Sequence, residues 1–343
     1  MNDVTYMERA LELAAAGCEW VSPNPMVGCV IVHEDRIIGE GFHRKYGEAH
    51  AEVNAIESVA DKALLPESTV YVTLEPCAHF GKTPPCADLL VRHRVKRVVI
   101  CNEDPFPRVS GRGIARLKEA GIQVETGLLA ERGEELNKRF FKAHRTGLPY
   151  IILKWAETAD GFISAEDGTP VKISNSVTDI TVHRWRAEED AILVGKNTVL
   201  TDNPRLNVRH WTSLKQPVRV VLATALEPDP AMHIFDNTQK TLIYNHQVSG
   251  TENNTEYIPA SDLTAVLRSL REKGINSVLV EGGRKIHESF IRQRLFDEIR
   301  VIKGSMILGR GISAPQLPSG ILLDKNIRIL NDLVFFYRSI PTF

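Results

Sequence analysis

Residues 69–86, TVYVTLEPCAHFGKTPPC, decide how the first half of this 343-residue chain folds. The apolar, β-branched run at 69–74 predicts a buried strand, and a helical pattern begins at Cys86. Cys77 therefore stands just past the end of a strand. Upstream, His50 directly precedes another helical pattern. Because an open α/β sheet binds ligands where its strands end and helices begin, these three side chains are candidates for one site.

The same alternation of strands and helices covers the whole first half. Strands are predicted at 26–32, 36–43, 69–74, 97–101 and 122–126. Helices are predicted at 6–16, 51–60, 86–93, 113–120 and 130–147. Strands that alternate with helices in this way predict a three-layer α/β sandwich.

The second half repeats the alternation with longer loops. Strands are predicted at 150–156, 191–195, 218–223, 241–244, 277–281 and 298–303, and helices at 177–188, 262–273 and 285–294. The halves are separated near Gly147, a residue type that commonly follows a helix, with Pro149 shortly after it. At roughly 150 residues per domain, we expect two α/β domains, residues 1–147 and 148–343.

Composition narrows the classes of partner. Lys and Arg total 42 and Asp and Glu total 43, so the formal net charge is −1, which argues against a nucleic-acid or membrane partner. No apolar run approaches the ~18 residues of a membrane span, and the first residues lack the basic start of a secretory signal. We therefore expect a cytoplasmic protein. Five cysteines in such a chain favour metal binding or catalysis over disulfides.

The candidate site has the composition of a catalytic zinc centre. His50, Cys77 and Cys86 supply one imidazole and two thiolates, which leaves a fourth zinc position open for water. Glu52 is interpreted as the general acid/base, because zinc can lower the pKa of bound water to about 7. A His-x-Glu pair followed by Pro-Cys-x-x-Cys is typical of zinc deaminases. Here eight residues separate the two cysteines, and His79 among them is an alternative fourth ligand.

That long spacer belongs to a set of motifs. His50-Ala51-Glu52, the segment EPCAHFGKTPPC at 75–86, Asn24-Pro25-Met26-Val27-Gly28 and Gly41-Phe42-His43 together resemble the bifunctional deaminase–reductase of riboflavin biosynthesis. The resemblance extends over residues 1–343. It implies a cytidine-deaminase-like fold for the first domain, with zinc as its metal.

The resemblance also implies substrate contacts in the first domain. Asn24 matches the family asparagine that bonds the pyrimidine, and a side-chain amide can both donate and accept. His43 and Lys82 are predicted to contact the ribose phosphate. Lys82 lies in a glycine-containing loop before a helix N-terminus, which favours an anion. The alternative for Lys82 is an ordinary solvated lysine.

The second half lacks the Gly-x-Gly-x-x-Gly fingerprint of a dinucleotide site. Its segments at 153–161, 191–209 and 280–283 instead resemble the reductase half of the same family, which implies a dihydrofolate-reductase-like fold and NADPH. By position, the predicted cofactor residues are Ala156, Thr198, Asp202, Gly282 and Gly283. The predicted substrate residues are Arg186, Leu206, Arg209 and Glu281. Arginine suits a phosphate because its guanidinium is a planar fork of donors.

One stretch departs from the family. Where the family has Glu-Ser-x-Trp-Ile-Ser/Thr, residues 169–174 read TPVKIS, so Pro170 replaces a serine on the substrate side and Lys172 replaces a tryptophan on the cofactor side. Lys172 is interpreted as a ligand for a cofactor phosphate. The alternative is a weakened site. The acid of the reduction is left open between Lys154 and Asp202.

We therefore expect zinc-dependent hydrolytic deamination of 2,5-diamino-6-(5-phosphoribosylamino)pyrimidin-4(3H)-one. NADPH-dependent reduction of the ribosyl group to ribityl would follow. A deaminase with an inactive second domain is one alternative. A nucleic-acid-editing deaminase is another, disfavoured by the long cysteine spacer, the net charge of −1 and the aromatic content of 7%. The partners implied are a small-molecule substrate and further copies of the chain, as a dimer or tetramer built on the second domain.

Overall fold

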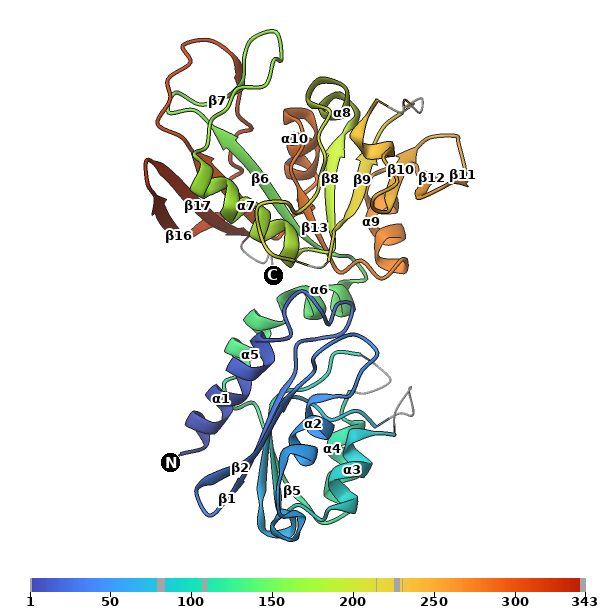
Figure 1. Cartoon of the computed structure of the whole chain (residues 1–343), viewed down its shortest axis with the longest axis vertical. Helices are drawn as coiled ribbons and strands as arrows, with labels where there is room; N and C mark the ends of the chain where they lie inside the picture. The colour runs from blue at the N-terminus through green and yellow to red at the C-terminus, as the bar shows by residue number, and fades with distance from the viewer. Residues whose placement is uncertain are drawn as a thin grey trace. The chain divides into compact units, whose positions relative to one another are not determined.

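The computed structural model describes residues 2–78, 84–106, 110–213, 215–224, 229 and 231–339. Contacts within the chain separate two compact units, Met1–Gly147 (unit 1) and Leu148–Phe343 (unit 2) (Figure 1). Gly147 has a φ of 70°, a conformation that glycine adopts without strain where a helix ends. Among the described residues, no helix is long and apolar enough to cross a membrane.

Unit 1 is built on a mixed sheet with the strand order β2-β1-β3-β4-β5. The strands are β1 (Gly28–His33), β2 (Arg36–Phe42), β3 (Thr69–Leu74), β4 (Arg97–Asn102) and β5 (Gln123–Thr126). β1 runs antiparallel to β2 and β3, whereas β3, β4 and β5 are parallel. The carboxyl ends of the parallel strands therefore lie at one edge of the sheet, where Cys77 follows β3.

Helices cover both faces of this sheet, as the predicted three-layer sandwich requires. The helices are α1 (Asp3–Ala15), α2 (Ala51–Ser58), α3 (Cys86–Arg92), α4 (Arg112–Glu119), α5 (Ala130–Leu136) and α6 (Lys138–Thr146). The apolar faces of α2, α3 and α4 pack into one core with alternate strand residues such as Ile31 and Val72. The intervening residues, such as Val30 and Tyr71, pack with α1 on the other face. The period of two along each strand thus produces two separate cores.

The single helix predicted at 130–147 is wrong in one respect, because the structure breaks it into α5 and α6 at Asn137. The backbone of Asn137 leaves helical geometry, with φ −105° and ψ 24°. Its buried side chain accepts from the Met26 N–H at 2.8 Å and donates to the Met26 carbonyl at 2.8 Å. This pair of bonds to a residue far away in the sequence compensates for the interrupted helix.

Unit 2 is built on a longer sheet with the order β11-β12-β10-β9-β8-β13-β6-β14-β17-β16. Neighbours from β12 to β14 are parallel, and antiparallel pairs close both ends. The strands are β6 (Tyr150–Glu157), β8 (Ala191–Gly195), β9 (Val218–Leu222), β10 (Thr241–Asn245), β11 (Gly250–Glu252), β12 (Thr255–Pro259), β13 (Ser277–Val280), β14 (Glu298–Lys303), β16 (Ile321–Ile329) and β17 (Asp332–Ser339). A separate small sheet pairs β7 (Phe162–Ser164) with β15 (Ile312–Ser313).

Helices again lie on both faces of the sheet (Figure 1). They are α7 (Ser176–Glu188), α8 (Lys196–Asp202), α9 (Leu263–Glu272) and α10 (Arg284–Arg292). α9 and α10 pack on the face that carries Leu153 and Val280, whereas α7 packs on the face of Ile152 and Leu279. Because the central strands of this sheet are parallel, the polar residues that follow them lie at one edge of the sheet.

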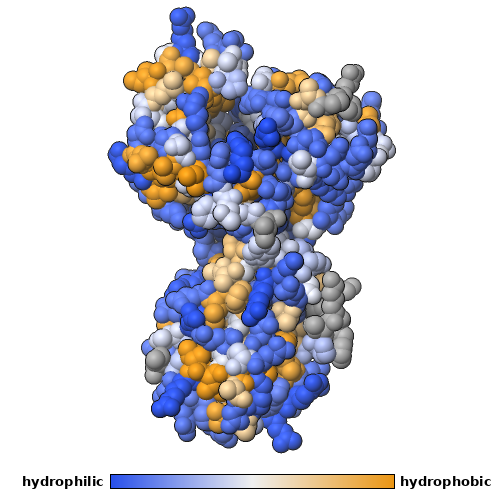
Figure 2. Space-filling model, in the orientation of Figure 1, coloured by the Kyte–Doolittle hydropathy of each residue, from blue (hydrophilic) through white to orange (hydrophobic). Residues whose placement is uncertain are grey.

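The β16–β17 hairpin was missed in the sequence, and β16 forms one edge of the sheet. Apolar side chains on this edge strand are exposed, including Leu322 at 61% and Leu323 at 51%. Figure 2 shows apolar residues gathered on the surface of unit 2 over this hairpin. An exposed apolar edge strand is a typical contact surface for another chain.

Candidate active sites

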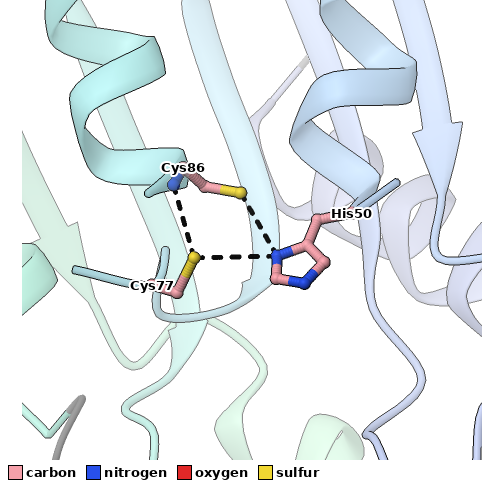
Figure 3. A group of neighbouring side chains, drawn as sticks. All are labelled: His50, Cys77 and Cys86. Carbon is pink, nitrogen blue, oxygen red and sulfur yellow. Dashed lines mark hydrogen bonds between the residues drawn. The ribbon is translucent and has the colours of Figure 1, made fainter. Parts of the chain in front are cut away.

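Three elements of unit 1 bring His50, Cys77 and Cys86 together (Figure 3). His50 is the residue directly before α2, Cys77 follows β3, and Cys86 is the first residue of α3. The His50 Nδ1 atom lies 3.6 Å from the Cys77 sulfur and 3.3 Å from the Cys86 sulfur. The Cys86 backbone N–H also points at the Cys77 sulfur, at 3.3 Å. The sequence prediction that these three groups meet is therefore matched by the geometry.

These donor atoms fit a zinc ion. A tetrahedral zinc with bonds of about 2.0 Å to nitrogen and about 2.3 Å to sulfur would hold such atoms about 3.5 Å apart. The observed separations of 3.3 and 3.6 Å lie on either side of that value. One imidazole and two thiols also form a donor set that zinc prefers. The arrangement leaves a fourth tetrahedral position for a water or a substrate atom.

The hydrogen bonds of the cluster shift the pKa values of its three members in different directions. Hydrogen bonds from Cys86 lower the pKa of Cys77 below the usual thiol range, which favours its thiolate form. The hydrogen bond with Cys77 raises the pKa of His50 to about 9. Metal binding therefore requires the loss of protons from His50 and from Cys86, whose pKa is raised by its hydrogen bond with Cys77.

Glu52 lies in the first turn of α2 and is 3% exposed. Burial raises the pKa of its carboxyl group to about 7, although the nearby His50 charge lowers it. A carboxyl group with a pKa near 7 can both take up and release a proton at neutral pH. This is the property required of the acid/base predicted at this position.

Asn24 and His43 form a hydrogen-bonded pair beside the metal ligands. Asn24 Nδ2 lies 3.2 Å from His43 Nε2, and His43 Nδ1 lies 3.0 Å from the Ala49 carbonyl oxygen. The ring of His43 is 3% exposed and packs edge-on against His50, with ring centres 5.5 Å apart. Burial lowers the pKa of His43, so the ring is neutral. Lys82 and His79 lie outside the described residues.

Two supporting residues of unit 1 were missed by the sequence analysis. Asn137 holds the segment after Asn24 through its bonds to Met26. Glu75, two residues before Cys77, is buried and accepts backbone N–H bonds from four residues at 2.9–3.3 Å: Asp104, Gly111, Gly113 and Ile114. A Cβ atom on Gly113 would lie 2.0 Å from the Pro76 carbonyl oxygen, so the approach of α4 requires glycine.

In unit 2, Arg186 and Glu281 form a bidentate ion pair between α7 and the end of β13. Their atoms lie 2.8 Å (Nε–Oε1) and 2.6 Å (Nη2–Oε2) apart, and the side chains are only 12% and 7% exposed. Burial alone would raise the pKa of Glu281, but the charges of Arg186 and Lys154 lower it to about 2. Arg186 also donates to the Asn207 carbonyl at 3.1 Å. The predicted substrate residues Arg186 and Glu281 are thus brought together, but each neutralises the other.

Lys154 and Arg209 supply further positive charge near this pair. The surrounding protein removes water from the Lys154 ammonium group, which lowers its pKa, although the charge of Glu281 opposes this. The Arg209 backbone N–H donates to Nδ1 of His183 at 3.1 Å. His183 is 3% exposed, and burial lowers its pKa to about 3, so the ring is a permanent acceptor. His183, one turn before Arg186 on α7, is a positioning residue that no sequence motif indicated.

Some of the predicted cofactor residues also come together. A Cβ atom on Gly283, which has a φ of 69°, would lie 3.3 Å from the Thr198 hydroxyl, so the start of α10 lies beside α8. Gly282 packs closely on Val194. Asp202 ends α8, is exposed and accepts from the Thr201 hydroxyl at 2.7 Å.

The other predicted site residues of unit 2 lie in separate environments. Ala156 lies near the end of β6 opposite Ile302. Lys172 is 67% exposed and pairs with Asp179 on α7. Pro170 is exposed in the segment before α7, whereas the side chain of Leu206 is buried in a core cluster at 2% exposure, which leaves only its backbone for a ligand.

A pocket of about 280 Å³ opens at the carboxyl edge of the unit 2 sheet. Its walls come from the segments after β9 and β10 and from the start of α9. Polar groups of the lining are Thr224, Asn245, His246, Ser261 and Asp262. The pocket is of a size and position suited to part of a nucleotide.

The fold and the site of unit 1 define a zinc-dependent deaminase class, joined in one chain to a second α/β unit. Residues 1–102 match the cytidine and deoxycytidylate deaminase zinc-binding region, and residues 149–333 match the RibD C-terminal domain. The chain belongs to the RibD family, the bifunctional deaminase–reductases of riboflavin biosynthesis. The riboflavin biosynthesis protein RibD of Bacillus amyloliquefaciens is 43% identical over 92% of this chain and 87% of that protein. Its counterpart in Aquifex aeolicus is 39% identical over 98% of both chains.

Solved structures of this family have the same architecture. Acinetobacter baumannii RibD superposes with a TM-score of 0.91 at 34% identity, covering 99% of both chains. A diaminohydroxyphosphoribosylaminopyrimidine deaminase/5-amino-6-(5-phosphoribosylamino)uracil reductase from Thermotoga maritima superposes with a TM-score of 0.88 at 35% identity, covering 98% of both chains. The expected pair of folds, a cytidine-deaminase-like unit and a reductase unit of the RibD type, is confirmed.

Proposed function

We propose that the two activities of the enzyme are divided between its two units. Unit 1 removes ammonia hydrolytically from 2,5-diamino-6-(5-phosphoribosylamino)pyrimidin-4(3H)-one, and unit 2 reduces the ribosyl group of the product to ribityl with NADPH. The observation that carries this proposal is the convergence of His50, Cys77 and Cys86 next to a buried Glu52. A donor set of this kind has no structural need for a buried carboxyl group beside it.

In unit 1, side chains of the chain would bind the metal, orient the substrate and transfer a proton. His50, Cys77 and Cys86 would hold zinc, which supplies a Lewis acid that makes a water nucleophilic at neutral pH. Glu52 takes the proton from that water and returns it to the departing amino group, because its pKa of about 7 permits both steps. Asn24 bonds the pyrimidine ring. Burial of Glu52 at 3% exposure keeps bulk solvent from competing for the proton.

In unit 2, the charged cluster orients the phosphoribosyl group. Arg209 binds the phosphate, since the guanidinium of Arg186 is already neutralised by Glu281. NADPH supplies the hydride for reduction of C1′. Lys154 is the better candidate for the accompanying proton than Asp202, because its pKa is lowered within the cluster whereas Asp202 is exposed.

The cofactor would lie along the carboxyl edge of the unit 2 sheet. Gly282, Gly283 and Thr198 line its middle, where a glycine pair lets backbone groups approach a pyrophosphate. The pocket after β9 and β10 takes the adenosine end. Lys172, interpreted from the sequence as a ligand for a cofactor phosphate, is exposed and already paired with Asp179, so we leave it out of the proposed cofactor site.

We also propose that the enzyme is a homo-oligomer that associates through β16. The support is that apolar side chains on this edge strand are exposed, with Leu322 and Leu323 more than half exposed. Replacement of both leucines by lysine should lower the mass measured by light scattering to that of one chain. An unchanged mass would exclude this surface.

The decisive experiment follows the diaminopyrimidine substrate by mass spectrometry with and without NADPH. Without NADPH, only the loss of ammonia is expected. With NADPH, the ribityl product should accumulate with stoichiometric oxidation of the cofactor. Deamination without any reduction would favour a weakened reductase, the alternative suggested by Pro170 and Lys172. No reaction in either arm would refute the proposal.

A further inference from the structure

The hydrogen bonds of His43 fix which of its ring nitrogens carries the proton. His43 Nδ1 lies 3.0 Å from the Ala49 carbonyl oxygen. A carbonyl oxygen only accepts, so Nδ1 donates. The other nitrogen, Nε2, lies 3.2 Å from Asn24 Nδ2. An amide amino group only donates, so Nε2 accepts from Asn24 and Nδ1 carries the single proton of the ring.

This arrangement decides which end of the Asn24 amide is available. Reversal of the amide would place its oxygen against the lone pair of His43 Nε2 at the same 3.2 Å, and two acceptors repel at that distance. The amino group therefore stays committed to His43. Among the described residues, the hydrogen bond of the Asn24 side chain is made by Nδ2, and none is made to Oδ1. The side chain thus offers an acceptor, and not a donor, to a ligand.

His43 has no ring nitrogen available for a hydrogen bond to a phosphate. Its ring is 3% exposed, and both nitrogens are used within the chain. A buried imidazole that makes both of its bonds specifies the position of its partners. The ring also packs against the metal ligand His50, with ring centres 5.5 Å apart, so it connects Asn24 to the metal cluster.

We infer that His43 is a positioning residue, which holds Asn24 so that its Oδ1 accepts a hydrogen bond from an N–H donor of the substrate ring. His43 then serves recognition of the base, in place of the phosphate contact that the sequence predicted. The inference rests on the proposed deaminase function and deepens it. It specifies that the substrate must have an N–H group facing Asn24, because Oδ1 can only accept.

The test is a double-mutant cycle on the full-length, zinc-loaded enzyme. Wild-type deamination is measured first, and its absence would refute the proposed function whatever the role of His43. The kcat/KM for deamination is then compared for His43→Leu, Asn24→Ala and the double variant. Loss of one neutral hydrogen bond predicts a drop of about tenfold in each single variant. The kcat/KM of the double variant should be no lower than that of the less active single variant, because both changes remove the same contact.

His43→Gln is the matched control, because an amide side chain also offers one donor and one acceptor. It should retain kcat/KM within about threefold of the wild type. Zinc content and the reductase rate of each variant report on the metal site and on unit 2. Effects that multiply to about 100-fold in the double variant would overturn the inference, as would equal defects in His43→Gln and His43→Leu. Zinc loss from both His43 variants would overturn it too, since His43 would then serve the metal ligands.

Discussion

The two units of the chain assemble their polar groups in opposite ways. In unit 1, the donor atoms of His50, Cys77 and Cys86 converge from three elements on one point, and a buried carboxyl group stands beside them. In unit 2, the charges of Arg186 and Glu281 are paired with one another, and the cations Lys154 and Arg209 lie around that pair. The donor atoms of the first site are placed to receive an ion, whereas the charges of the second site are satisfied by its own side chains.

This difference affects what a mutation does. In unit 1 a single change should remove chemistry with little effect on folding, because the donor groups lie at helix ends outside the main cores. In unit 2 the same kind of change also leaves a charge unpaired in a partly enclosed site, which costs stability. Predictions that separate catalysis from stability therefore test the comparison directly.

The largest effect is expected for Glu52→Gln. The amide cannot move a proton, so deamination should fall by about 10²–10⁴-fold while zinc content and the reductase rate stay unchanged. Glu57→Gln, on the exposed side of the same helix, is the matched control and should behave as the wild type. The rates are measured by release of ammonia. A Glu52→Gln enzyme with more than about a tenth of the normal rate would contradict the assignment.

The next effect concerns the Arg186–Glu281 pair. Glu281→Leu leaves the Arg186 charge in a poorly solvated position, so the free energy of unfolding of unit 2 should fall by about 3–5 kcal/mol. Denaturant unfolding should show this as an earlier transition, with the activity of unit 1 retained. The double variant Arg186→Met/Glu281→Leu should recover most of the stability but none of the reductase activity. Recovery of activity as well would show that the pair has only a structural role.

A smaller, pH-dependent effect is expected for Lys154. Its pKa is lowered from the ordinary 10.5 by the loss of water around the ammonium group. A lysine donates a proton only below its pKa, so reductase kcat/KM should decline as pH rises through that lowered value, earlier than for an ordinary lysine. Arginine keeps its proton at every working pH, so Lys154→Arg should lower the reductase rate and remove this decline. A decline that is identical in both enzymes would assign the proton to another group.

The smallest effect is expected for Lys172→Ala. Lys172 is 67% exposed and its partner Asp179 is 30% exposed, so the pair should contribute only about 0–1 kcal/mol. The KM for NADPH should change by less than about twofold. A large rise in the KM for NADPH, without a rise for NADH, would instead show that Lys172 binds the cofactor phosphate as the sequence suggested.

The metal cluster could be predicted from the sequence because its signal is local. Each ligand stands at the junction of a strand or helix that the apolar periodicity already marks, and the residue types leave few other chemistries. The supporting residues could not be found in this way. The bonds from Glu75 to Gly111 and Gly113, and from Asn137 to Met26, are made to backbone atoms, and a backbone N–H is the same in every non-proline residue.

In unit 2, strand positions were predictable but pairing was not. The apolar runs of β6 and β8 show where strands lie, yet nothing in them indicates that Arg186 would meet Glu281, 95 residues later. The β16–β17 hairpin was missed because β16 is exposed along most of its length and lacks a buried alternating pattern. His183 had no motif because its bond also goes to a backbone N–H.

The break of the last helix at Asn137 has a consequence for excising the catalytic part of unit 1. The match to the deaminase zinc-binding region ends at residue 102. Asn137, whose side chain makes two hydrogen bonds to the Met26 backbone, lies beyond that end. A fragment trimmed to the matched region would keep every zinc ligand. It would lose the hydrogen bonds between Asn137 and Met26, and also the backbone N–H groups that donate to the buried Glu75. A transplantable minimal deaminase therefore has to extend at least through α5 and Asn137, some 35 residues beyond the matched region.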